Sequence, residues 1–327
     1  MNSILEIKNL SIDLVDGRKT YPVVNDINLS IKKKQRYGIV GESGSGKSLT
    51  SLAIMNLLAD SLKITRGSIV LDGKHELTKM KKKELRKVRG HDISMIFQEP
   101  MTALDPLYPI EHQILEVLRF HFTFSKKQMR DMAVEMLKKV GISRPEQIMK
   151  NYPHQLSGGM RQRVMIAMAL ICSPKLLIAD EPTTALDVTI QAQILDLMNE
   201  LTEDFDTSIL MITHDLGVIV EMCERVAVMY AGEIVEETTV AKLFSNPAHP
   251  YTSGLLRSVQ SLGNRTQSLY SIPGTVPTPK QQTAGCRFAS RCPHVMPVCN
   301  SSPPFLEIGN DHSTKCWLYA KEGVVNA

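Results

Sequence analysis

Residues 41–48 read GESGSGKS, and this stretch decides the fold. It matches the pattern G-x-x-x-x-G-K-S, in which a glycine-rich loop turns its backbone N–H groups toward a phosphate group. The apolar run Tyr37 to Val40 precedes the loop as an expected strand, and Ser48 to Ala59 follows it with apolar residues at helical spacing. A strand, a loop and a helix in this order favour a phosphate-binding loop over an ordinary glycine-rich turn. We expect the phosphate contacts to come from Gly41, Ser43, Gly44, Ser45, Gly46, Lys47 and Ser48.

The side chains expected to act on a nucleotide lie at two places in the sequence. In the loop, Lys47 is suited to bind the β and γ oxygens, and the Ser48 hydroxyl is suited to bind magnesium (Mg²⁺). Farther on, the apolar run Leu176 to Ala179 reads as a buried strand that ends in Asp180 and Glu181. At such a strand end Asp180 can hold Mg²⁺ through water, and Glu181 can polarise an attacking water. The two places together predict a nucleoside triphosphatase.

The composition is that of an ordinary folded protein. Of the 327 residues, 43% are hydrophobic and 22% are charged, which excludes collagen-like, disordered and low-complexity chains. The formal net charge of +4 does not by itself indicate a nucleic-acid partner. The longest apolar run, Val164 to Cys172, is far shorter than the ~20 residues of a membrane helix, and Met1 to Leu14 lacks a signal-peptide core. We therefore expect a cytosolic, soluble chain.

Sequence periodicity predicts an α/β core. Alternating apolar residues before residue 32 are typical of strands, so the chain begins with a β-rich part. Ser208 to Thr213 reads as a second buried strand after the one at 176–179, and a helical stripe at 190–201 joins the two. Two buried strands joined by a helix are typical of a parallel sheet with right-handed crossovers.

Two further parts accompany this core. Between about 101 and 165 the pattern is helical, and Ser125 is expected to cap a helix whose apolar stripe, Met129 to Val140, we interpret as core rather than as a cofactor pocket. The basic run Lys79 to Arg89 is interpreted as a solvated face. After residue 237, prolines accumulate and indicate a small irregular domain. We predict domains at 1–237, with its helical subdomain at about 101–165, and at 238–327.

One motif assigns the triphosphatase to a class. Leu156-Ser-Gly-Gly-Met160, followed by Arg-Gln-Arg, resembles the signature of ATP-binding cassette (ABC) proteins, with Met160 where the family usually has Gln. Ser157 is expected to cap a helix, so that its hydroxyl and the N–H groups of Gly158 and Gly159 form an anion-binding N-terminus. The resemblance implies a head-to-tail dimer, in which this signature closes over the γ-phosphate of ATP bound by a second ABC ATPase, identical or paralogous.

Other residues follow in the order that the family uses. Gln98, the Ala-Leu-Asp sequence that ends in Asp187, and His214 resemble its Q-loop, D-loop and switch histidine. The resemblance implies that Gln98 senses Mg²⁺ and the attacking water and couples to the membrane subunits, that Asp187 crosses the dimer interface, and that His214 contacts the γ-phosphate. Tyr21 is the candidate for stacking on adenine, although the commonest family spacing points nearer Arg18; a surface or packing tyrosine is the alternative.

Three longer segments resemble one branch of the family, the ATPase subunits of bacterial dipeptide and oligopeptide importers. They are 98–106, 152–157 and 246–256. The resemblance implies a P-loop NTPase (RecA-like) core with a β-rich N-terminal part, an inserted helical subdomain and a Cys-containing tail. It implies ATP hydrolysis on the cytoplasmic face of the cell membrane with two transmembrane permease subunits, and indirectly with an extracellular solute-binding protein.

Two alternatives stay open at this point. The same branch also serves nickel, metal chelates and some oligosaccharides, so the solute is not determined by these residues. A soluble ABC ATPase that acts on ribosomes or nucleic acid is the rival from another class. Such chains usually fuse two cassettes or insert long coiled coils, and this sequence has neither, so we expect no nucleic-acid partner.

Four cysteines in the tail suggest a metal centre. Cys286, Cys292, Cys299 and Cys316 are spaced C-x5-C-x6-C-x16-C, and a cytosolic compartment keeps thiols reduced, which favours a metal over disulfides. This spacing is wider than that of zinc knuckles, so zinc is the weaker alternative, and tetrahedral sulfur also suits iron–sulfur clusters. The importer resemblance includes Gly285-Cys-Arg-Phe-x-x-Arg-Cys and implies a 4Fe-4S cluster with all four cysteines as ligands. Unliganded thiols are the remaining alternative, and Cys172 and Cys223 are expected in the core.

Overall fold

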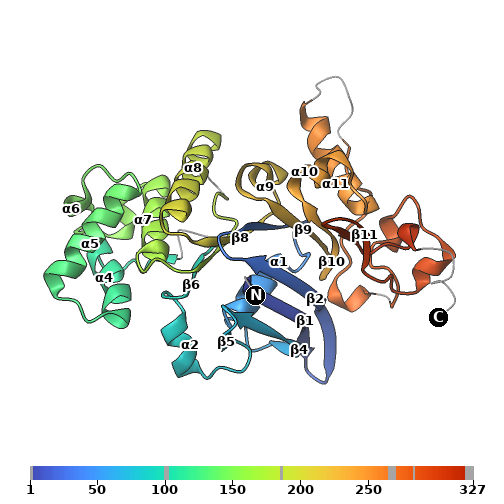
Figure 1. Cartoon of the computed structure of the whole chain (residues 1–327), viewed down its shortest axis with the longest axis horizontal. Coiled ribbons are helices and arrows are strands. Elements are labelled where there is room, and N and C mark those ends of the chain that lie inside the picture. The colour runs from blue at the N-terminus through green and yellow to red at the C-terminus, as the bar shows by residue number, and fades with distance from the viewer. Residues whose placement is uncertain (1–2, 99–102, 185–186, 264–269, 283, 321–327) are drawn as a thin grey trace. The chain divides into compact units, whose positions relative to one another are not determined.

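The computed structural model describes residues 3–98, 103–184, 187–263, 270–282 and 284–320 (Figure 1). The chain forms two compact units. The first unit contains residues 79–211 together with the short segments 1–4 and 31–35. The second unit contains residues 5–30, 36–78 and 212 onward, so the phosphate loop and the C-terminal tail belong to the same unit.

An antiparallel sheet forms the N-terminal part of the second unit, as the alternation predicted. Strands β1 and β4 pair from Leu5 opposite Leu71 to Leu14 opposite Leu62, and the alternate residues of β1 are buried. The sheet has the order β2-β1-β4-β5. Its strands are β1 (Ser3–Asp16), β2 (Lys19–Lys32), β4 (Leu62–Leu71) and β5 (His75–Glu76).

The remaining strands of the second unit carry the phosphate loop and part of the tail. Their order is β11-β12-β10-β9-β3, with β3 parallel to β9 and the other pairs antiparallel. The strands are β3 (Arg36–Val40), β9 (Arg225–Tyr230), β10 (Glu233–Thr239), β11 (Leu306–Gly309) and β12 (His312–Thr314), and the helices are α1 (Lys47–Ile54), α9 (Leu216–Met222), α10 (Val240–Ser245) and α11 (Pro250–Gly263). The tail is therefore less irregular than predicted, because β12 extends the ladder of β10.

One predicted boundary in the second unit was wrong. The helix after the phosphate loop ends at Ile54 rather than near Ala59, and Asn56 there adopts a left-handed backbone with φ of 51°. A left-handed residue ends a helix because it directs the chain out of the helical path. Strand β4 begins at Leu62, and its first half pairs with the distal end of β1.

In the first unit, three strands and a group of helices are arranged around buried apolar residues. The strand order is β8-β7-β6, and β6 and β7 are parallel. All five residues of β7 are buried, which confirms the predicted strand buried on both faces. The elements are α2 (Lys82–Val88), β6 (Ile93–Ile96), α4 (Ile110–His121), α5 (Lys126–Lys139), α6 (Pro145–Ile148), α7 (Gly158–Leu170), β7 (Leu176–Asp180), α8 (Val188–Asp204) and β8 (Ser208–Thr213).

Helices α4 to α7 form the helical cluster drawn in green in Figure 1. The predicted cap of α5 is confirmed: Ser125 Oγ accepts a hydrogen bond of 3.2 Å from Gln128 N, and Ser125 N donates one of 2.9 Å to the Gln128 side chain. The apolar stripe of α5 is buried against α4, α6 and α7, so it is core, as expected. In α2 only Leu85 and Val88 are buried, which leaves the basic run on a solvated face.

Within the described residues, no helix combines the length and the apolar character needed to cross a membrane.

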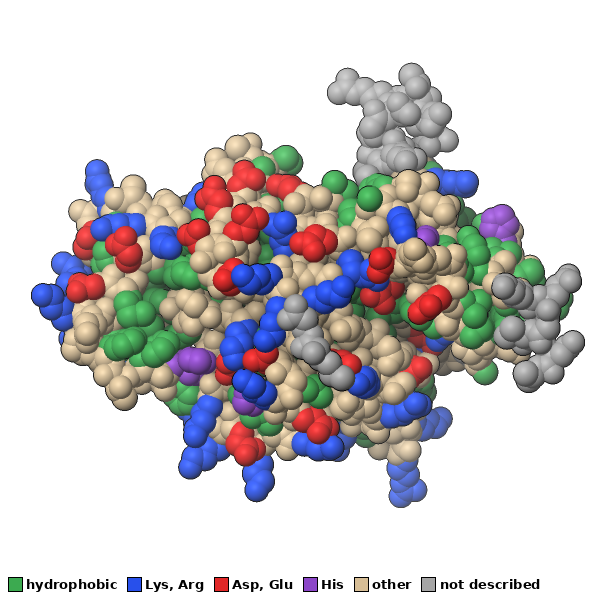
Figure 2. Space-filling model, viewed as in Figure 1, with side chains coloured by type: hydrophobic (Ala, Val, Ile, Leu, Met, Phe, Trp, Pro, Cys, Tyr) green, Lys and Arg blue, Asp and Glu red, His purple; other side chains and the backbone are tan. Residues whose placement is uncertain are grey.

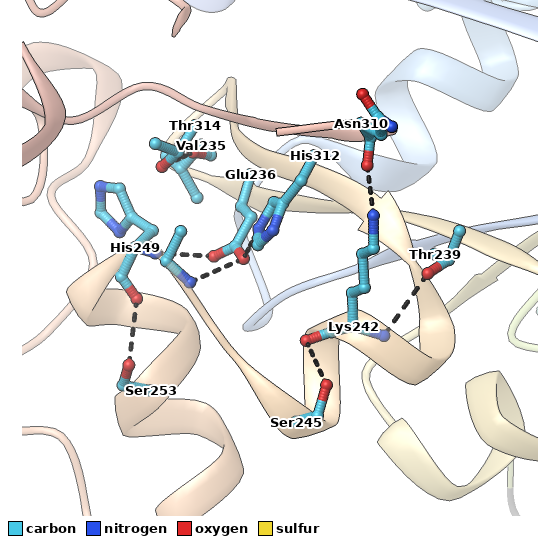
Figure 3. Close-up of polar contacts among 11 residues, drawn as sticks. Val235, Glu236, Thr239, Lys242, Ser245, His249, Ser253, Asn310, His312 and Thr314 are labelled. Carbon is cyan, nitrogen blue, oxygen red and sulfur yellow. Dashed lines mark hydrogen bonds and ion pairs between the residues drawn. The ribbon is translucent and has the colours of Figure 1, made fainter. Parts of the chain in front are cut away.

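A buried carboxylate fastens the tail to β10 (Figure 3). Glu236 is fully buried, and its carboxylate accepts hydrogen bonds from Ala248 N (2.8 Å), His249 N (2.7 Å) and His312 Nε2 (2.8 Å). The His249 ring is also buried, and burial lowers its pKa to about 3, so its neutral Nδ1 accepts a hydrogen bond from Tyr251 N. Through Glu236, the strand β10, the start of α11 and the strand β12 share one polar centre.

Candidate functional site

The phosphate-loop sequence forms a turn that depends on glycine. Gly44 and Gly46 have φ of +78° and +101°, a left-handed backbone that glycine adopts without steric cost. A Cβ atom on Gly41 would lie 2.1 Å from the carbonyl oxygen of Met229, so the loop leaves β3 in close contact with β9. Ser43 is exposed, whereas Ser45 is buried and its Oγ forms no hydrogen bond within the described chain. The loop therefore presents polar groups around a compact turn.

Lys47 and Ser48 begin α1 directly after this turn. The Lys47 side chain is buried and folds back over the loop, where its Nζ donates to the carbonyl oxygens of Gly41 (2.8 Å) and Glu42 (3.1 Å). A lysine held across a glycine-rich loop at a helix N-terminus provides the positive potential that phosphate oxygens need. The backbone geometry and the donor set thus fit a nucleotide phosphate.

Two other predicted residues of the second unit lie near strand ends. His214 follows β8 and is exposed, next to the helix α9 that Asp215 caps through a hydrogen bond from Gly217 N. The Tyr21 ring is half-buried, and the tail residue Lys280 lies over it, with Nζ 5.5 Å from the ring centroid. One face of the ring is therefore in contact with a cation from the tail.

In the first unit, the structure brings Gln98 and Glu181 together. Gln98 Nε2 donates a hydrogen bond of 3.0 Å to Glu181 Oε2, and Thr184 Oγ1 donates another of 3.0 Å to the same oxygen. Glu181 has φ of 49°, an uncommon backbone conformation for a residue with a side chain. Asp180, the last residue of β7, is buried. A carboxylate oriented by two donors beside a buried one is suited to receive a proton from water.

The signature sequence begins α7, as its pattern predicted. Ser157 is the N-cap residue, and its Oγ accepts a hydrogen bond of 3.3 Å from Met160 N. A Cβ atom on Gly158 would meet no other atom within 4 Å, so this helix start faces open space. Deeper in α7, the buried Gln162 donates to the carbonyl oxygen of Pro182, the residue after Glu181. This bond connects the signature helix to the loop that carries Glu181.

Asp187 caps α8, with its carboxylate accepting a hydrogen bond of 3.0 Å from Ile190 N. Its neighbours Ala185 and Leu186 in the predicted D-loop lie outside the described residues, as do residues 99–102 after Gln98.

The four tail cysteines lie near one another. Burial raises the pKa of Cys286 to about 11, and the neighbouring thiols of Cys299, Cys316 and Cys292 also raise it, whereas a hydrogen bond from the Phe288 backbone lowers it. Cys286 N donates to the Cys299 carbonyl oxygen at 2.9 Å, and a Cβ on Gly285 would lie 2.3 Å from that oxygen. The glycine before Cys286 therefore allows the close approach of the two cysteine segments.

The thiols are not arranged around a single point. Cys286, Cys292, Cys299 and Cys316 are free thiols, and within the described residues no group of three or more His, Cys, Asp or Glu is placed to hold a metal ion. The metal centre that the sequence suggested, whether a 4Fe-4S cluster or zinc, is thus not seen as a preformed ligand group among the described residues. The chemistry of the donor set, four soft sulfur atoms in one small domain, fits thiolate-bound metals. Outside this group, burial raises the pKa of Cys172 to about 11 and that of Cys223 to about 12, as expected of core thiols.

Sequence reasoning missed residues that bind the phosphate loop from the tail. Tyr251 Oη accepts a hydrogen bond from Glu42 N, and Arg291 forms an ion pair with the Glu42 carboxylate. Both residues stand in segments that the sequence singled out, 246–256 and 285–292. The signal was present in the arginine next to Cys292, but a sequence does not show which distant residue an arginine contacts.

The family models cover most of the described fold. The model of ABC transporters matches residues 24–184, and the model of the oligopeptide/dipeptide transporter C-terminal region matches residues 235–299. The second match covers the part of the tail that contains α10, α11 and the first three cysteines.

Curated relatives match almost the whole chain. The oligopeptide transport ATP-binding protein AppD of Bacillus subtilis is 53% identical over 99% of both chains. The dipeptide transport ATP-binding protein DppD of Bacillus subtilis is 48% identical over 97% of this chain and 95% of its own. The oligopeptide transport ATP-binding protein OppD of Haemophilus influenzae is 45% identical over 98% of this chain and 99% of its own.

Solved structures match the cassette part. The ATP-binding cassette MJ0796, in a dimeric post-hydrolysis state bound to ADP and Pi, has a TM-score of 0.64 and 31% identity; the match covers 72% of this chain and 98% of that one. The expected α/β fold with a P-loop core and a helical subdomain is thereby confirmed. The chain belongs to the ATP-binding cassette transporter family, in the branch of the ATPase subunits of oligopeptide and dipeptide transporters.

Proposed function

We propose that this ATPase drives the import of dipeptides or oligopeptides across the cytoplasmic membrane. The observation that carries the proposal is the match over 99% of the chain, tail included, to an oligopeptide transport ATP-binding protein. The tail itself matches a region described for oligopeptide and dipeptide transporters. These matches favour a peptide as solute over nickel or a metal chelate, and they favour a transporter over a ribosome or a nucleic acid as partner.

In the proposed reaction, the second unit binds the nucleotide phosphates. Lys47 and the backbone N–H groups of residues 41–48 hold the β and γ oxygens of ATP. Ser48, Asp180 and Gln98 each offer a hard oxygen donor of the kind that Mg²⁺ prefers, and these residues would hold the ion. When bound, Mg²⁺ neutralises charge on the phosphate oxygens. Tyr21 stacks on adenine, in place of its contact with Lys280.

The hydrolytic step belongs to Glu181 and His214. Glu181 accepts the proton of the attacking water, because its carboxylate is held in one orientation by Gln98 and Thr184. His214 is exposed at the end of β8 and stabilises the charge of the γ-phosphate. The proposed role also accounts for the uncommon backbone conformation of Glu181, because this conformation directs the carboxylate out of the end of β7.

A second ABC ATPase, identical or paralogous, completes the site. Ser157, Gly158 and Gly159 lie at a helix start, and the space beside Gly158 is open in this chain, which suits the binding of a γ-phosphate held by a partner. Asp187 lies beside this partner in the head-to-tail dimer. Binding of ATP closes the dimer, and hydrolysis reopens it.

The first unit offers a surface for the permease subunits, on the cytoplasmic face of the membrane. Hydrophobic side chains gather over the helical cluster on the face that Figure 2 shows. A groove of about 660 Å³ lies in this unit and is lined in part by Ala103, Asp105 and Tyr108, and Leu107 beside them in the chain is 79% exposed. Its walls combine cations, aromatic rings and histidines, among them Arg86, Arg89, Tyr108, His112, Phe120 and His121. An amphipathic cytoplasmic segment of a permease fits such a surface.

We further propose that Cys286, Cys292, Cys299 and Cys316 hold a 4Fe-4S cluster. Their mutual proximity and sulfur donors support it, and a cluster needs one thiolate per iron rather than four thiolates around one ion. The cluster supplies a rigid link among segments of the tail that have little regular structure.

Purification of the tagged chain from gently solubilised membranes tests the proposed partners. We expect two hydrophobic permease subunits and an ABC ATPase to co-purify with it, and a solute-binding protein only when peptide is added. Recovery of ribosomal proteins or nucleic acid without a permease would contradict the proposal.

The iron content of the same preparation, made anaerobically, tests the cluster. We expect about four irons and four sulfides per chain, because each thiolate holds one iron of the cluster. Cys286→Ser should lower the iron content severely, whereas Cys172→Ser, at a buried thiol outside the group, should retain it. Wild-type protein with neither iron nor sulfide would exclude the cluster. One zinc ion per chain in its place would show that the four cysteines bind zinc instead.

A further inference from the structure

A residue of the C-terminal tail, Arg291, binds the side chain of Glu42, the first variable residue of the phosphate loop. Arg291 Nη1 donates to Glu42 Oε2 at 2.9 Å, and Nη2 donates to Glu42 Oε1 at 3.2 Å. The Arg291 side chain is only 5% exposed, and that of Glu42 is 27% exposed, so this two-pronged pair is largely shielded from solvent. Two parallel charged hydrogen bonds fix the orientation of a carboxylate as well as its position.

The guanidinium of Arg291 is itself held in place. Its Nε donates to the Pro273 carbonyl oxygen at 2.8 Å, and its Nη2 also donates to the Ile272 carbonyl oxygen at 3.2 Å. Tyr230 Oη accepts a further bond of 3.4 Å from Nη1. Because two tail carbonyl oxygens and the hydroxyl of Tyr230 in β9 accept from these donors, Arg291 is preorganised for Glu42 and loses little side-chain freedom when it binds.

A second tail residue holds the backbone of Glu42. Tyr251 Oη accepts a hydrogen bond of 2.8 Å from Glu42 N. Tyr251 is fully buried, and its ring packs against Tyr230 and Phe288, with centroids 4.6 Å and 5.5 Å away. Both the amide and the carboxylate of Glu42 are thus bound by residues of one aromatic and basic cluster, which comprises Tyr230, Tyr251, Phe288 and Arg291.

The conformation of Glu42 matters to the loop because its carbonyl oxygen accepts a hydrogen bond from Lys47 Nζ. Rotation of the peptide after Glu42 would move the acceptor that positions Lys47. We propose that Arg291 and Tyr251 are positioning residues for ATP binding, which hold residues 41–48 in the conformation that receives phosphate. The inference rests on the proposed phosphate-binding role of these residues, and it makes the tail part of the nucleotide site.

The test is ATP affinity of the full-length chain, measured by titration with a fluorescent ATP analogue. Arg291→Gln and Glu42→Gln each remove the charged pair, and we expect each to weaken binding about tenfold, since a hydrogen bond to a charged group contributes to this extent. The double variant should bind as each single variant does, because both lose the same interaction. Tyr251→Phe removes only the hydroxyl and should weaken binding severalfold.

Control variants distinguish an effect on loop position from an effect on folding and from the phosphate-binding role of the loop itself. Arg225→Gln breaks the ion pairs of another arginine with Glu237 and with the tail residue Asp311, at the end of β9 away from the loop, and should leave ATP affinity unchanged. Glu42→Gln and Tyr251→Phe keep the test informative if Arg291→Gln does not fold.

Wild-type ATP affinity in the Arg291, Glu42 and Tyr251 variants, with binding lost in Lys47→Ala, would overturn the positioning role alone. Wild-type affinity in Lys47→Ala would instead refute the phosphate-binding role. A loss of thermal stability without a loss of ATP affinity would also overturn the inference, because that result would show that the Arg291–Glu42 pair stabilises the tail without positioning the loop.

Discussion

Replacing Glu181 with glutamine is expected to lower the rate of ATP hydrolysis by at least 100-fold and to leave ATP binding intact. The carboxylate accepts hydrogen bonds from Gln98 Nε2 and Thr184 Oγ1, both at 3.0 Å, and an amide oxygen can accept the same two bonds. The substitution therefore preserves the local geometry and removes only the ability to take a proton from water. General bases contribute about 10²- to 10⁴-fold to a rate, which sets the expected size of the effect.

The measurement is phosphate release by the purified protein, together with its nucleotide affinity. Glu200→Gln is the matched control, because Glu200 is an exposed glutamate on α8 in the same unit. It should hydrolyse ATP at the wild-type rate. Turnover of Glu181→Gln at the wild-type rate would remove Glu181 from the role of general base.

Replacing Glu236 with alanine is expected to reduce the free energy of unfolding by about 3 kcal/mol. The substitution leaves the buried N–H groups of Ala248 and His249 and the His312 ring without their acceptor (Figure 3). Each buried polar group that loses its partner costs roughly 1–3 kcal/mol. Because Glu236 joins β10 to the start of α11 and to β12, the tail should open before the rest of the chain.

Denaturant unfolding followed by tryptophan fluorescence measures this effect, since the single tryptophan, Trp317, lies in the tail. Glu307→Ala provides the control: Glu307 is an exposed glutamate on β11, also in the tail. Its unfolding midpoint should stay at the wild-type value. An unchanged midpoint for Glu236→Ala would show that the buried carboxylate does not anchor the tail.

Local signals in the sequence were sufficient to predict much of the fold. Ser125 and Ser157 were expected to cap helices, and both accept a backbone hydrogen bond as N-cap residues. The uninterrupted apolar run before Asp180 predicted a strand buried on both faces, and β7 is such a strand. These features depend on residues a few positions apart, so their chemistry is visible in the order of the sequence.

Features that depend on distant residues could not be predicted. Glu236 stands in a strand with four other acidic or hydroxyl residues, and nothing in that pattern distinguishes a fully buried carboxylate from a solvated one. Arg291 and Glu42 are 249 positions apart. Both interactions arise only when the tail packs on the rest of the second unit, and burial of a charge requires a partner that local sequence does not reveal.

The residues of the candidate site were predicted from the order of the motifs along the chain, but the contacts among these residues were not. The pairing of Gln98 with Glu181 and the left-handed backbone of Glu181 are visible only in the structure. The helix after the phosphate loop was predicted too long because Asn56, which ends it, carries no signal as strong as glycine or proline.

Peptide uptake by living cells tests the central claim most directly. Cells whose only copy of this gene encodes Glu181→Gln would be compared with wild-type cells and with cells that carry Glu200→Gln, using a radiolabelled oligopeptide as the solute. The account predicts that wild-type and Glu200→Gln cells accumulate the peptide, and that Glu181→Gln cells accumulate none above the background of energy-depleted cells. Equal accumulation in all three would contradict the claim that ATP hydrolysis by this chain drives peptide import.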